Sequence, residues 1–353
     1  MELSDIRALR LALHGCPEPS GQEDRTRAML MKFLSSHTTL ELCPCGAGFY
    51  AAHREPGGSK PPIALRADYD ALALPEGGAA HLCGHDGHAA ALCGAALSIQ
   101  GEALGRDVFF LFQPAEETGA GALDCLELFR RERVAQVYGA HNLPGVPLGQ
   151  VLTRPGTFAC ASQGVTLSLL GRPTHAAYPE HGLSPAQAVG RLLCALPALA
   201  DPSRFGGMAL CTVIGVEMGG RSFGAAAAQA QVRLTLRAEL DRDLETLHSD
   251  ILQLAGSLAA EYGLAFSCQV QDVFPATVND PGCAQRVLDC CCGGLLDAPM
   301  RWSEDFGHYL RLCPGAFFGI GAGEGCPPLH TAGYQYPDAL LEPTVAAFRA
   351  LLN

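Results

Sequence analysis

The chain has 353 residues, 48% of them hydrophobic and 17% charged, so we expect a large apolar core and no extensive disorder. This length exceeds what one hydrophobic core usually supports, which favours two domains. The formal net charge of −12 argues against binding to nucleic acid or to acidic membranes, and no apolar run is long enough to span a membrane.

The N-terminal segment, MELSDIRALRLALHG, has charges inside an apolar pattern, which predicts an amphipathic helix and not a signal peptide. The sequence Ser20-Gly-Gln-Glu23 predicts a capping box, with a helix that continues to about Leu34. Sixteen cysteines in a long chain without a signal peptide favour a reducing cytoplasm, where most thiols serve as small core side chains.

The octapeptide HLCGHDGH, residues 81–88, places a thiol, three imidazoles and a carboxylate close together. Cysteine and histidine clustered at such short spacing typically bind a first-row transition metal. The alternative is a loop that happens to be rich in histidine. Alanine-rich sequence follows, which predicts a buried helix that begins within the octapeptide.

Three apolar segments further along the chain predict buried strands, each followed by a residue that can bind metal. Residues 108–112 lead to Glu116 and Glu117, residues 135–140 lead to His141, and residues 315–320 lead through a glycine-rich loop to His330. Adjacent side chains diverge, so one glutamate can bind metal while the other faces a reacting water. Open α/β sheets place ligands at the carboxyl ends of strands, so these residues are expected to meet. Taken singly, each could instead be a solvated acidic turn or an ordinary core or surface histidine.

The pattern changes from about Ser162 and predicts a β-α-β-β-α-β order, which is typical of a ferredoxin-like unit. Its strands are expected at 165–170, 208–216, 229–239 and 264–272, and its helices at 184–196 and 241–262. The first of these helices would begin with a capping box, Ser184-Pro-Ala-Gln187. We therefore predict an α/β protein whose metal-binding catalytic domain, residues 1–159 and 275–353, has a mixed sheet flanked by helices. Residues 160–274 form the inserted ferredoxin-like domain.

The candidate metal-binding residues belong to a set of motifs. This set resembles that of the amidohydrolase subfamily of the aminoacylase/carboxypeptidase metallopeptidase family, M20. That subfamily includes hippurate hydrolases, N-acetyl-diaminopimelate deacetylases and auxin-conjugate hydrolases. The motifs occur in the family's order along nearly the whole chain: LHGCPEPSGQE (13–23), LRADYDAL (65–72), HLCGHDGH (81–88), FQPAEE (112–117), GAHNLPGVPLG (139–149), THAAYPE (174–180), SEDF (303–306) and LHT (329–331).

The resemblance implies hydrolysis of the amide bond of small N-acyl amino acids by a centre of two divalent ions. It implies Glu116 as the general base and Asp68 as a support of the metal centre, although spacing does not separate Asp68 from Asp70. Asp86 and His88 are expected to orient ligands or to begin the helix. The implied metal ligands are Cys83, His85, Glu117, His141 and His330.

Zinc or manganese is the expected metal, with nickel and cobalt as alternatives. Metal binding should weaken in acid, because histidine ligands must be neutral. The amino-acid product, the acyl group and the pathway are not fixed by these motifs.

The resemblance also gives residues 160–274 the role of a lid and of the contact surface of a homodimer. His175 matches a family histidine that stabilises the oxyanion and, in related dimers, reaches the partner's active site. Arg237 matches an arginine that binds the substrate's α-carboxylate. The alternatives are a surface histidine in a loop and an exposed strand arginine. Gly224 replaces an asparagine of the family, so we expect an altered substrate pocket.

Two other functions stay open. A dipeptidase or carboxypeptidase would use the same centre on a peptide bond, with a carboxylate to receive the free amino group of the substrate. A metal-binding or sensor protein would have lost turnover through its altered lid. Glu116 argues against the sensor, since a passive metal site needs no base.

Overall fold

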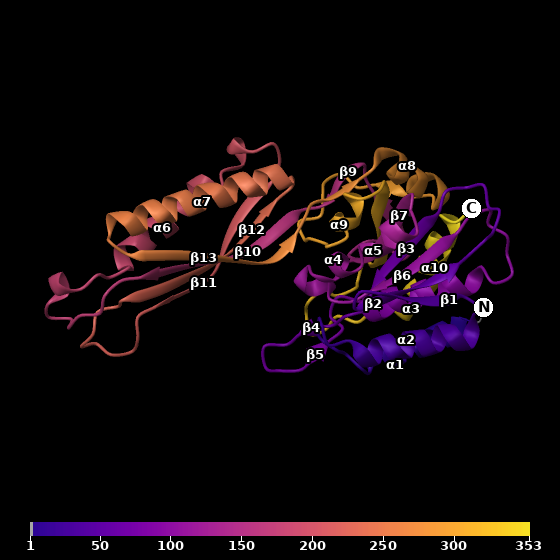
Figure 1. The fold of residues 1–353 in the computed structure, drawn as a ribbon, viewed down its shortest axis with the longest axis horizontal. Helices are drawn as coiled ribbons and strands as arrows, with labels where there is room; N and C mark the ends of the chain where they lie inside the picture. Colours follow the sequence, from indigo (N-terminus) through magenta and orange to yellow (C-terminus); the bar gives the residue numbers. More distant parts are fainter. Residues whose placement is uncertain (1–2) are drawn as a thin grey trace. The chain divides into compact units, whose positions relative to one another are not determined.

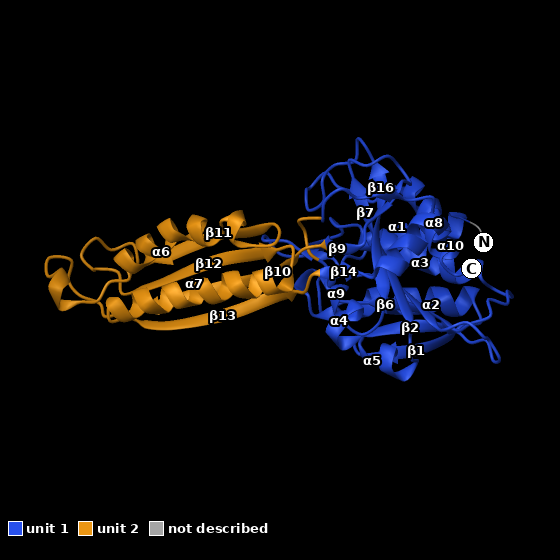
Figure 2. Ribbon diagram, turned by 90° about the horizontal axis from the view of Figure 1, so that it is seen from above, with its two compact units in different colours: residues 1–158, 277–299, 304–353 blue, residues 159–276, 300–303 orange. Residues whose placement is uncertain are grey.

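The computed structural model describes residues 3–353 and divides into two compact units (Figures 1 and 2). Unit 1 contains the described residues up to 158 together with 277–299 and 304–353. Unit 2 contains residues 159–276 and 300–303. Residues 1–2 of the predicted N-terminal helix lie outside the described part of the chain. Within the described part, no helix combines the length and apolar character needed to traverse a membrane.

Unit 1 is built on an eight-stranded mixed sheet with the order β1-β2-β6-β3-β7-β16-β8-β15. Four neighbouring strands at its centre are parallel: β6 (Val108–Gln113), β3 (Ile63–Asp68), β7 (Gln136–Pro144) and β16 (Gly315–Gly323). These strands are almost entirely buried, which explains why their sequences are continuous apolar runs and do not alternate. The three strands predicted around residues 108–112, 135–140 and 315–320 are confirmed.

Shorter elements complete this unit. The outer strands of the sheet are β1 (Glu41–Cys45), β2 (Gly48–His53), β8 (Val151–Thr153) and β15 (Gly294–Leu295). Two small ribbons pair β4 (Leu72–Ala73) with β5 (Ala79–Ala80) and β9 (Gly156–Ala159) with β14 (Thr277–Asn279). The helices are α1 (Leu3–His14), α2 (Asp24–His37), α3 (His85–Ser98), α4 (Gly121–Asp124), α5 (Glu127–Arg131), α8 (Pro281–Cys290), α9 (Gly307–Leu310) and α10 (Leu341–Ala350).

Helix α3 is the centre of the unit 1 core. It packs against α1, α2, α10 and strand β3, and its residues 85–96 are all buried. A helix surrounded on every side needs small residues where its neighbours approach closely, which accounts for its alanines and glycines. The second half of the octapeptide, residues 85–88, is thereby anchored in the buried core of the unit.

Replacing Gly87 of α3 by alanine is expected to lower the free energy of unfolding by about 1–3 kcal/mol, because the core is overpacked. A Cβ there would enter the ring of Tyr336, which is buried and bound through its hydroxyl to Thr344 at 3.1 Å. Urea unfolding followed by circular dichroism measures the change. Gly190→Ala is the matched control, because Gly190 lies exposed in a helix with nothing within 4 Å of an added Cβ. The free energy of unfolding of Gly190→Ala should rise by about 0.5–1 kcal/mol, because alanine favours the helix over the unfolded chain more than glycine does.

Unit 2 has the element order β10 (Ala161–Leu170), α6 (Ala186–Leu199), β11 (Ala209–Met218), β12 (Gln229–Ala238), α7 (Asp241–Glu261) and β13 (Ala265–Phe274). This is the predicted β-α-β-β-α-β order. The strands form an antiparallel sheet in the order β11-β12-β10-β13, and α6 and α7 cover one of its faces (Figure 2). Alternate residues of β12 are buried against the helices, which is the pattern of a sheet covered on one side.

Both predicted capping boxes are wrong, although both helices exist. Helix α2 begins at Asp24 without a side-chain cap, because Ser20 and Glu23 serve other groups. The Ser20 hydroxyl donates to Asp70 at 2.7 Å, and Glu23 accepts from the amide of Ala115 at 2.8 Å. Helix α6 begins at Ala186. The Ser184 hydroxyl accepts from the amide of Ala186 at 3.3 Å, but no hydrogen bond of Gln187 among the described residues completes the predicted box. Ser20 and Glu23 therefore connect the loop before α2 to the segments after β3 and β6, which carry Asp70 and Ala115.

Candidate metal centre

The carboxyl ends of the parallel strands carry the polar residues of unit 1. Asp68 ends β3, and Glu116 and Glu117 follow β6 in a short 3₁₀ turn. His141 lies within the last half of β7, and β16 leads into the loop that contains His330. Since these strands are parallel neighbours, their side chains reach one edge of the sheet, where the octapeptide also begins α3.

The structure brings together the five side chains predicted to bind metal. The sulfur of Cys83 lies 3.3 Å from His141 Nε2 and 3.4 Å from His330 Nε2. Glu117 Oε1 lies 3.6 Å from His330 Nε2 and 3.9 Å from His85 Nε2. These separations allow neighbouring groups to share an ion, and the overlapping sets leave room for more than one.

Three buried polar atoms at this place have no hydrogen-bond partner in the described chain: His85 Nε2, Glu116 Oε1 and Glu117 Oε1. Native proteins rarely keep such atoms unpaired, since each costs about 1–3 kcal/mol. A cation would satisfy all three at once. Sulfur, imidazole nitrogen and carboxylate oxygen are also the donors that zinc and similar divalent ions prefer, so these residues fit a metal centre.

Asp70 orients the His85 ring. Its carboxylate lies 2.9 Å from His85 Nδ1, which therefore carries the proton and leaves the lone pair of Nε2 able to bind a cation. The same carboxylate accepts hydrogen bonds from the Ser20 hydroxyl and, at 3.0 Å, from the amide of Glu117. Asp70 thus aligns one histidine ligand and the loop that carries the paired glutamates.

Asp68 has different partners. One of its oxygens lies 2.6 Å from His88 Nδ1, and the other lies 2.7 Å from an Arg66 nitrogen and 3.9 Å from His85 Nε2. Both ring nitrogens of His88 are engaged, because Nε2 lies 2.5 Å from the Asn142 amide oxygen. The two aspartates that sequence spacing could not separate are therefore distinguished by their contacts.

Asp86 turns toward α1 instead of the centre. Its carboxylate lies 2.8 Å from His14 Nδ1 and 3.6 Å from an Arg10 nitrogen. This contact fastens the beginning of α3 to α1.

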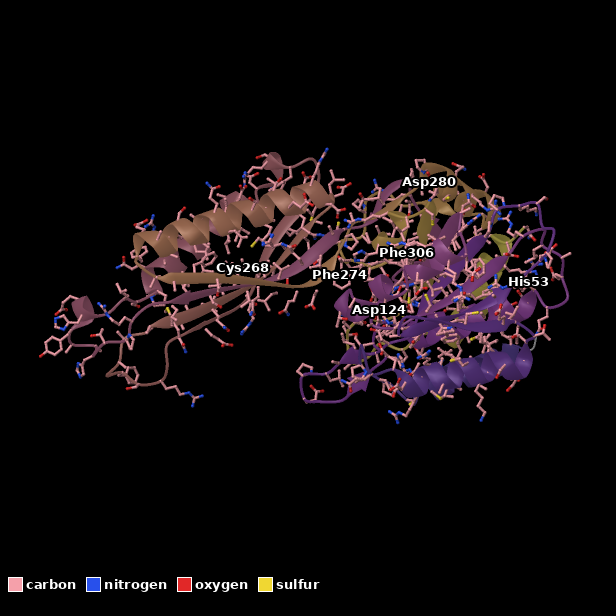
Figure 3. All side chains as sticks on the ribbon, in the orientation of Figure 1. His53, Asp124, Cys268, Phe274, Asp280 and Phe306 are labelled. Atoms are coloured by element: carbon pink, nitrogen blue, oxygen red, sulfur yellow. The ribbon has the colours of Figure 1, made fainter. Side chains whose placement is uncertain are left out.

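Sequence reasoning assigned no role to a buried ionic cluster around Arg66. The guanidinium, 1% exposed, binds Asp305 at 2.8 Å and Glu304 at 3.3 Å in addition to Asp68. Glu304 also lies 3.9 Å from His141 Nε2. The available signal was a pair of adjacent acids just before a buried aromatic residue, Phe306, which is labelled in Figure 3. The centroid of its ring lies 4.9 Å from that of Phe317.

The electrostatics of the site call for a cation. Burial, followed by the charges of Glu304 and Asp305, holds the pKa of Glu116 well above its usual range. Burial also raises the pKa of Glu117 to about 7 and that of Glu304 to about 8. So many buried carboxyl groups cannot all ionise without a counter-charge. Burial and then His88 keep the pKa of His141 well below its usual range, so its ring is neutral, as a ligand must be.

The backbone at the centre is held in uncommon conformations. Ala115 and His330 have positive φ angles of 52° and 60°, which non-glycine residues adopt rarely and mainly where surrounding structure imposes them. The amide of His330 donates to the carbonyl of Leu82 at 2.8 Å, which fixes its loop to the octapeptide. Gly84, with φ 98°, immediately precedes α3, and a Cβ at this position would lie 2.5 Å from the Asn142 amide oxygen.

Unit 2 contains three further residues singled out from the sequence: His175, Arg237 and Gly224. His175 is exposed, and its Nδ1 accepts from the amide of Ala177 at 3.1 Å. Arg237 is half-buried and donates to the Ser303 hydroxyl at 2.8 Å, with no carboxylate of the described chain at ion-pairing distance. Gly224 accepts, through its carbonyl, from the amide next to His175.

An α/β unit with clustered side chains able to bind metal, beside paired glutamates at the carboxyl edge of its sheet, has the features of a metal-dependent hydrolase. Residues 64–353 match peptidase family M20/M25/M40, and the chain belongs to this family. The family inferred from the motifs is therefore confirmed.

Curated relatives share sequence with most of the chain. It is 29% identical over 344 residues to an N-acetyldiaminopimelate deacetylase of Exiguobacterium sibiricum, covering 91% of both chains. It is also 29% identical to an N-acetyl-L-cysteine deacetylase of Bacillus subtilis, over 88% of this chain and 79% of the other. A solved dinuclear metal-binding peptidase of the M20 family from Bacillus subtilis has a TM-score of 0.82 at 25% identity, covering 99% and 97% of the two chains.

Proposed function

We propose that the protein hydrolyses the amide bond of small N-acyl amino acids, with two divalent metal ions, and releases a carboxylate and an amino acid. The observation that carries this proposal is the convergence of five metal-capable side chains beside Glu116, whose buried oxygen has no partner in residues 3–353. Relatives named as deacetylases of N-acetyldiaminopimelate and N-acetyl-L-cysteine support the substrate class.

Five side chains would hold the two ions: Cys83, His85, Glu117, His141 and His330. Zinc or manganese suits this mixture of sulfur, nitrogen and oxygen donors. Such ions, when bound, would lower the pKa of a water and polarise the carbonyl of the scissile amide. The thiol and Glu117 contribute negative charge that partly offsets the charge of the metals.

Glu116 acts as the general base. Its second carboxylate oxygen lies 3.9 Å from His85 Nε2, so the group faces the place where the attacking water must lie. It takes the proton from that water and delivers it to the nitrogen of the leaving amine. Burial raises the pKa of Glu116 in the chain alone, and the positive charge of bound ions would lower it again, so that the group is ionised before it takes the proton.

His175 stabilises the oxyanion that forms on the substrate carbonyl. Because its Nδ1 accepts a hydrogen bond from the amide of Ala177, the neutral ring carries its proton on Nε2, which is free to donate.

Unit 2 acts as the lid and as the contact of a homodimer. An exposed apolar row on the edge strand β11, namely Val213, Ile214, Val216 and Met218, supports this role, because unpaired edges readily pair with another strand.

Arg237→Ala is expected to raise KM for N-acyl amino acids roughly 10- to 100-fold, because a charge-assisted contact with the substrate's α-carboxylate is lost. Amides without that carboxylate should be little affected. Steady-state kinetics on matched substrate pairs gives the measurement. Arg233→Ala is the control, since Arg233 lies on the same strand but pairs with Glu217. Equal losses on both kinds of amide would count against the carboxylate contact.

A hydrolysis screen tests the function as a whole. N-acetyl, N-benzoyl and N-succinyl amino acids and dipeptides are incubated with the protein, with and without added Mn²⁺ or Zn²⁺. Metal-dependent release of amino acids from the N-acyl compounds is expected. Faster cleavage of dipeptides would favour a dipeptidase instead, and no cleavage by the metal-loaded protein would contradict a hydrolase. A cytoplasmic location accompanies the proposal, supported by a cysteine-rich sequence in which no disulfide joins any of the described residues.

A further inference from the structure

Arg106 is a buried cation whose charge is not balanced by any carboxylate of residues 3–353. It is 7% exposed, and its Nε has no hydrogen-bond partner in this part of the chain. Arg106 lies two residues before the start of β6, whereas Glu116 follows the end of that strand, so Arg106 lies at the edge of the sheet away from the metal centre. Burying an unpaired guanidinium is costly, which makes this arrangement unusual in a folded protein.

Two more cations lie close to Arg106. Burial lowers the pKa of Arg106, and the nearby charge of Arg286 in α8 lowers it further. Arg286 donates only to the carbonyl of Leu351, at 3.0 Å, and its buried Nε is unpaired among the described residues. The Lys60 ammonium donates to a backbone oxygen of Asn353 at 3.3 Å. Cations held together in this way, in a chain with a net charge of −12, require an explanation.

Lys60 and Arg106 line a cavity of about 380 Å³ together with Arg54, Glu55, Asp107 and the loop 56–58. The two acids of the cavity are engaged by backbone amides. Glu55 accepts from the amides of residues 104 and 105 at 2.6 and 2.9 Å, and Asp107 accepts from the amide of Glu55 at 2.8 Å. His53, labelled in Figure 3, marks the same end of the unit, 3.5 Å from Glu55.

The third cation of the cavity is already paired, because Arg54 binds Glu41 and Glu132 at 2.8 and 2.9 Å. Lys60 and Arg106 form no ion pair with a side chain of residues 3–353, so their charges are the ones that an anion would meet, beside the carboxylates of Glu55 and Asp107, which keep their negative charge. A guanidinium presents parallel N–H groups that match the oxygens of a phosphate, and an ammonium adds a point charge beside it.

We propose that this cavity is a binding site for a small oxyanion, inorganic phosphate or the phosphate group of a metabolite, held by Arg106 and Lys60 with Arg286 adding to the positive field. The site is separate from the metal centre and does not depend on the proposed hydrolysis. It would let a phosphorylated metabolite stabilise unit 1 from the opposite edge of its sheet.

Equilibrium dialysis of the metal-loaded protein against radiolabelled inorganic phosphate tests the proposal. The wild type is expected to bind one phosphate per chain more than Arg106→Met, whose affinity at this site should fall roughly 10- to 100-fold. Lys60→Met should weaken binding less. Arg130→Met is the control, because Arg130 is an exposed cation of the same unit outside the cavity. Phosphate bound at the metal centre would be present in all four proteins and so cancels in the comparison.

Competition with glycerol 3-phosphate separates the two sources of the ligand. Displacement at lower concentration than unlabelled phosphate identifies a phosphate ester, and displacement at equal or higher concentration identifies the inorganic ion. Equal phosphate binding by the wild type and Arg106→Met, including none by either, would overturn the proposal. If Arg106→Met does not fold, Arg106→Lys and Lys60→Met decide the matter, since unchanged affinity in both would overturn it equally.

Discussion

The Glu116→Gln protein is expected to lose about 10²- to 10⁴-fold in kcat while it keeps its full metal content. Glutamine preserves the shape of the side chain but cannot accept the proton of the attacking water. The carboxylate is buried, and one of its oxygens has no partner among residues 3–353, so the substitution leaves the packing of the site nearly unchanged. Steady-state kinetics on an N-acyl amino acid and elemental analysis of the same preparation give both quantities.

Glu117→Gln is the matched comparison, because the two glutamates are neighbours and only their roles differ. That variant should lose metal, since Glu117 lies near both His85 and His330, and its activity should return in part when excess metal is added. Unchanged turnover in Glu116→Gln with intact metal would show that another group moves the proton. Loss of metal from Glu116→Gln would show instead that the two glutamates share the ligand role.

Chelation is expected to abolish hydrolysis and to lower the melting temperature by on the order of 10 °C. Metal present at a thousand times its Kd stabilises the folded state by roughly 4 kcal/mol, and in a unit of this size each kcal/mol corresponds to about 2–4 °C. Without the ions, the carboxyl groups of Glu116, Glu117 and Glu304 remain crowded and buried. Differential scanning fluorimetry before and after chelation, and after metal is restored, measures the shift.

Two variants sharpen this experiment. His85→Ala should start at the lower melting temperature and show little further shift with chelator. Asp70→Asn keeps every ligand but weakens the orientation of His85, so its metal affinity should fall about 10- to 100-fold. Asp86→Asn should leave metal affinity unchanged, because that aspartate contacts α1. A chelator that leaves the melting temperature of the wild type unaltered would contradict a metal centre in unit 1.

The parts of the molecule that the sequence predicted well are those in which local pattern and burial agree. Continuous apolar runs identified the central parallel strands, and alternation with intervening helices identified the order of elements in unit 2. Spacing within the octapeptide and the strand ends pointed to one edge of the sheet, where the structure brings the five side chains together.

Contacts between distant segments could not be predicted in the same way. Ser20 and Glu23 have the spacing of a capping box, but both bind groups far along the chain. Arg66 stood in an apolar strand, and only folding shows that the acids of residues 304–305 surround it. Pairwise ionic contacts of this kind have no periodicity, so no local pattern predicts them.

The topology of unit 1 has a consequence for the rate at which the protein folds. Strands β7 and β16 are hydrogen-bonded neighbours, yet all of unit 2 is inserted between Pro144 and Gly315. Within unit 2 the first and last strands pair, with Ser162 opposite Phe274, so once this unit is folded it joins its own two ends. If unit 2 folds first, the flexible connection between β7 and β16 becomes effectively shorter. The entropy cost of pairing β16 with β7 is then lower. The loop carrying His330 follows β16, so slow formation of unit 2 would delay the acquisition of metal.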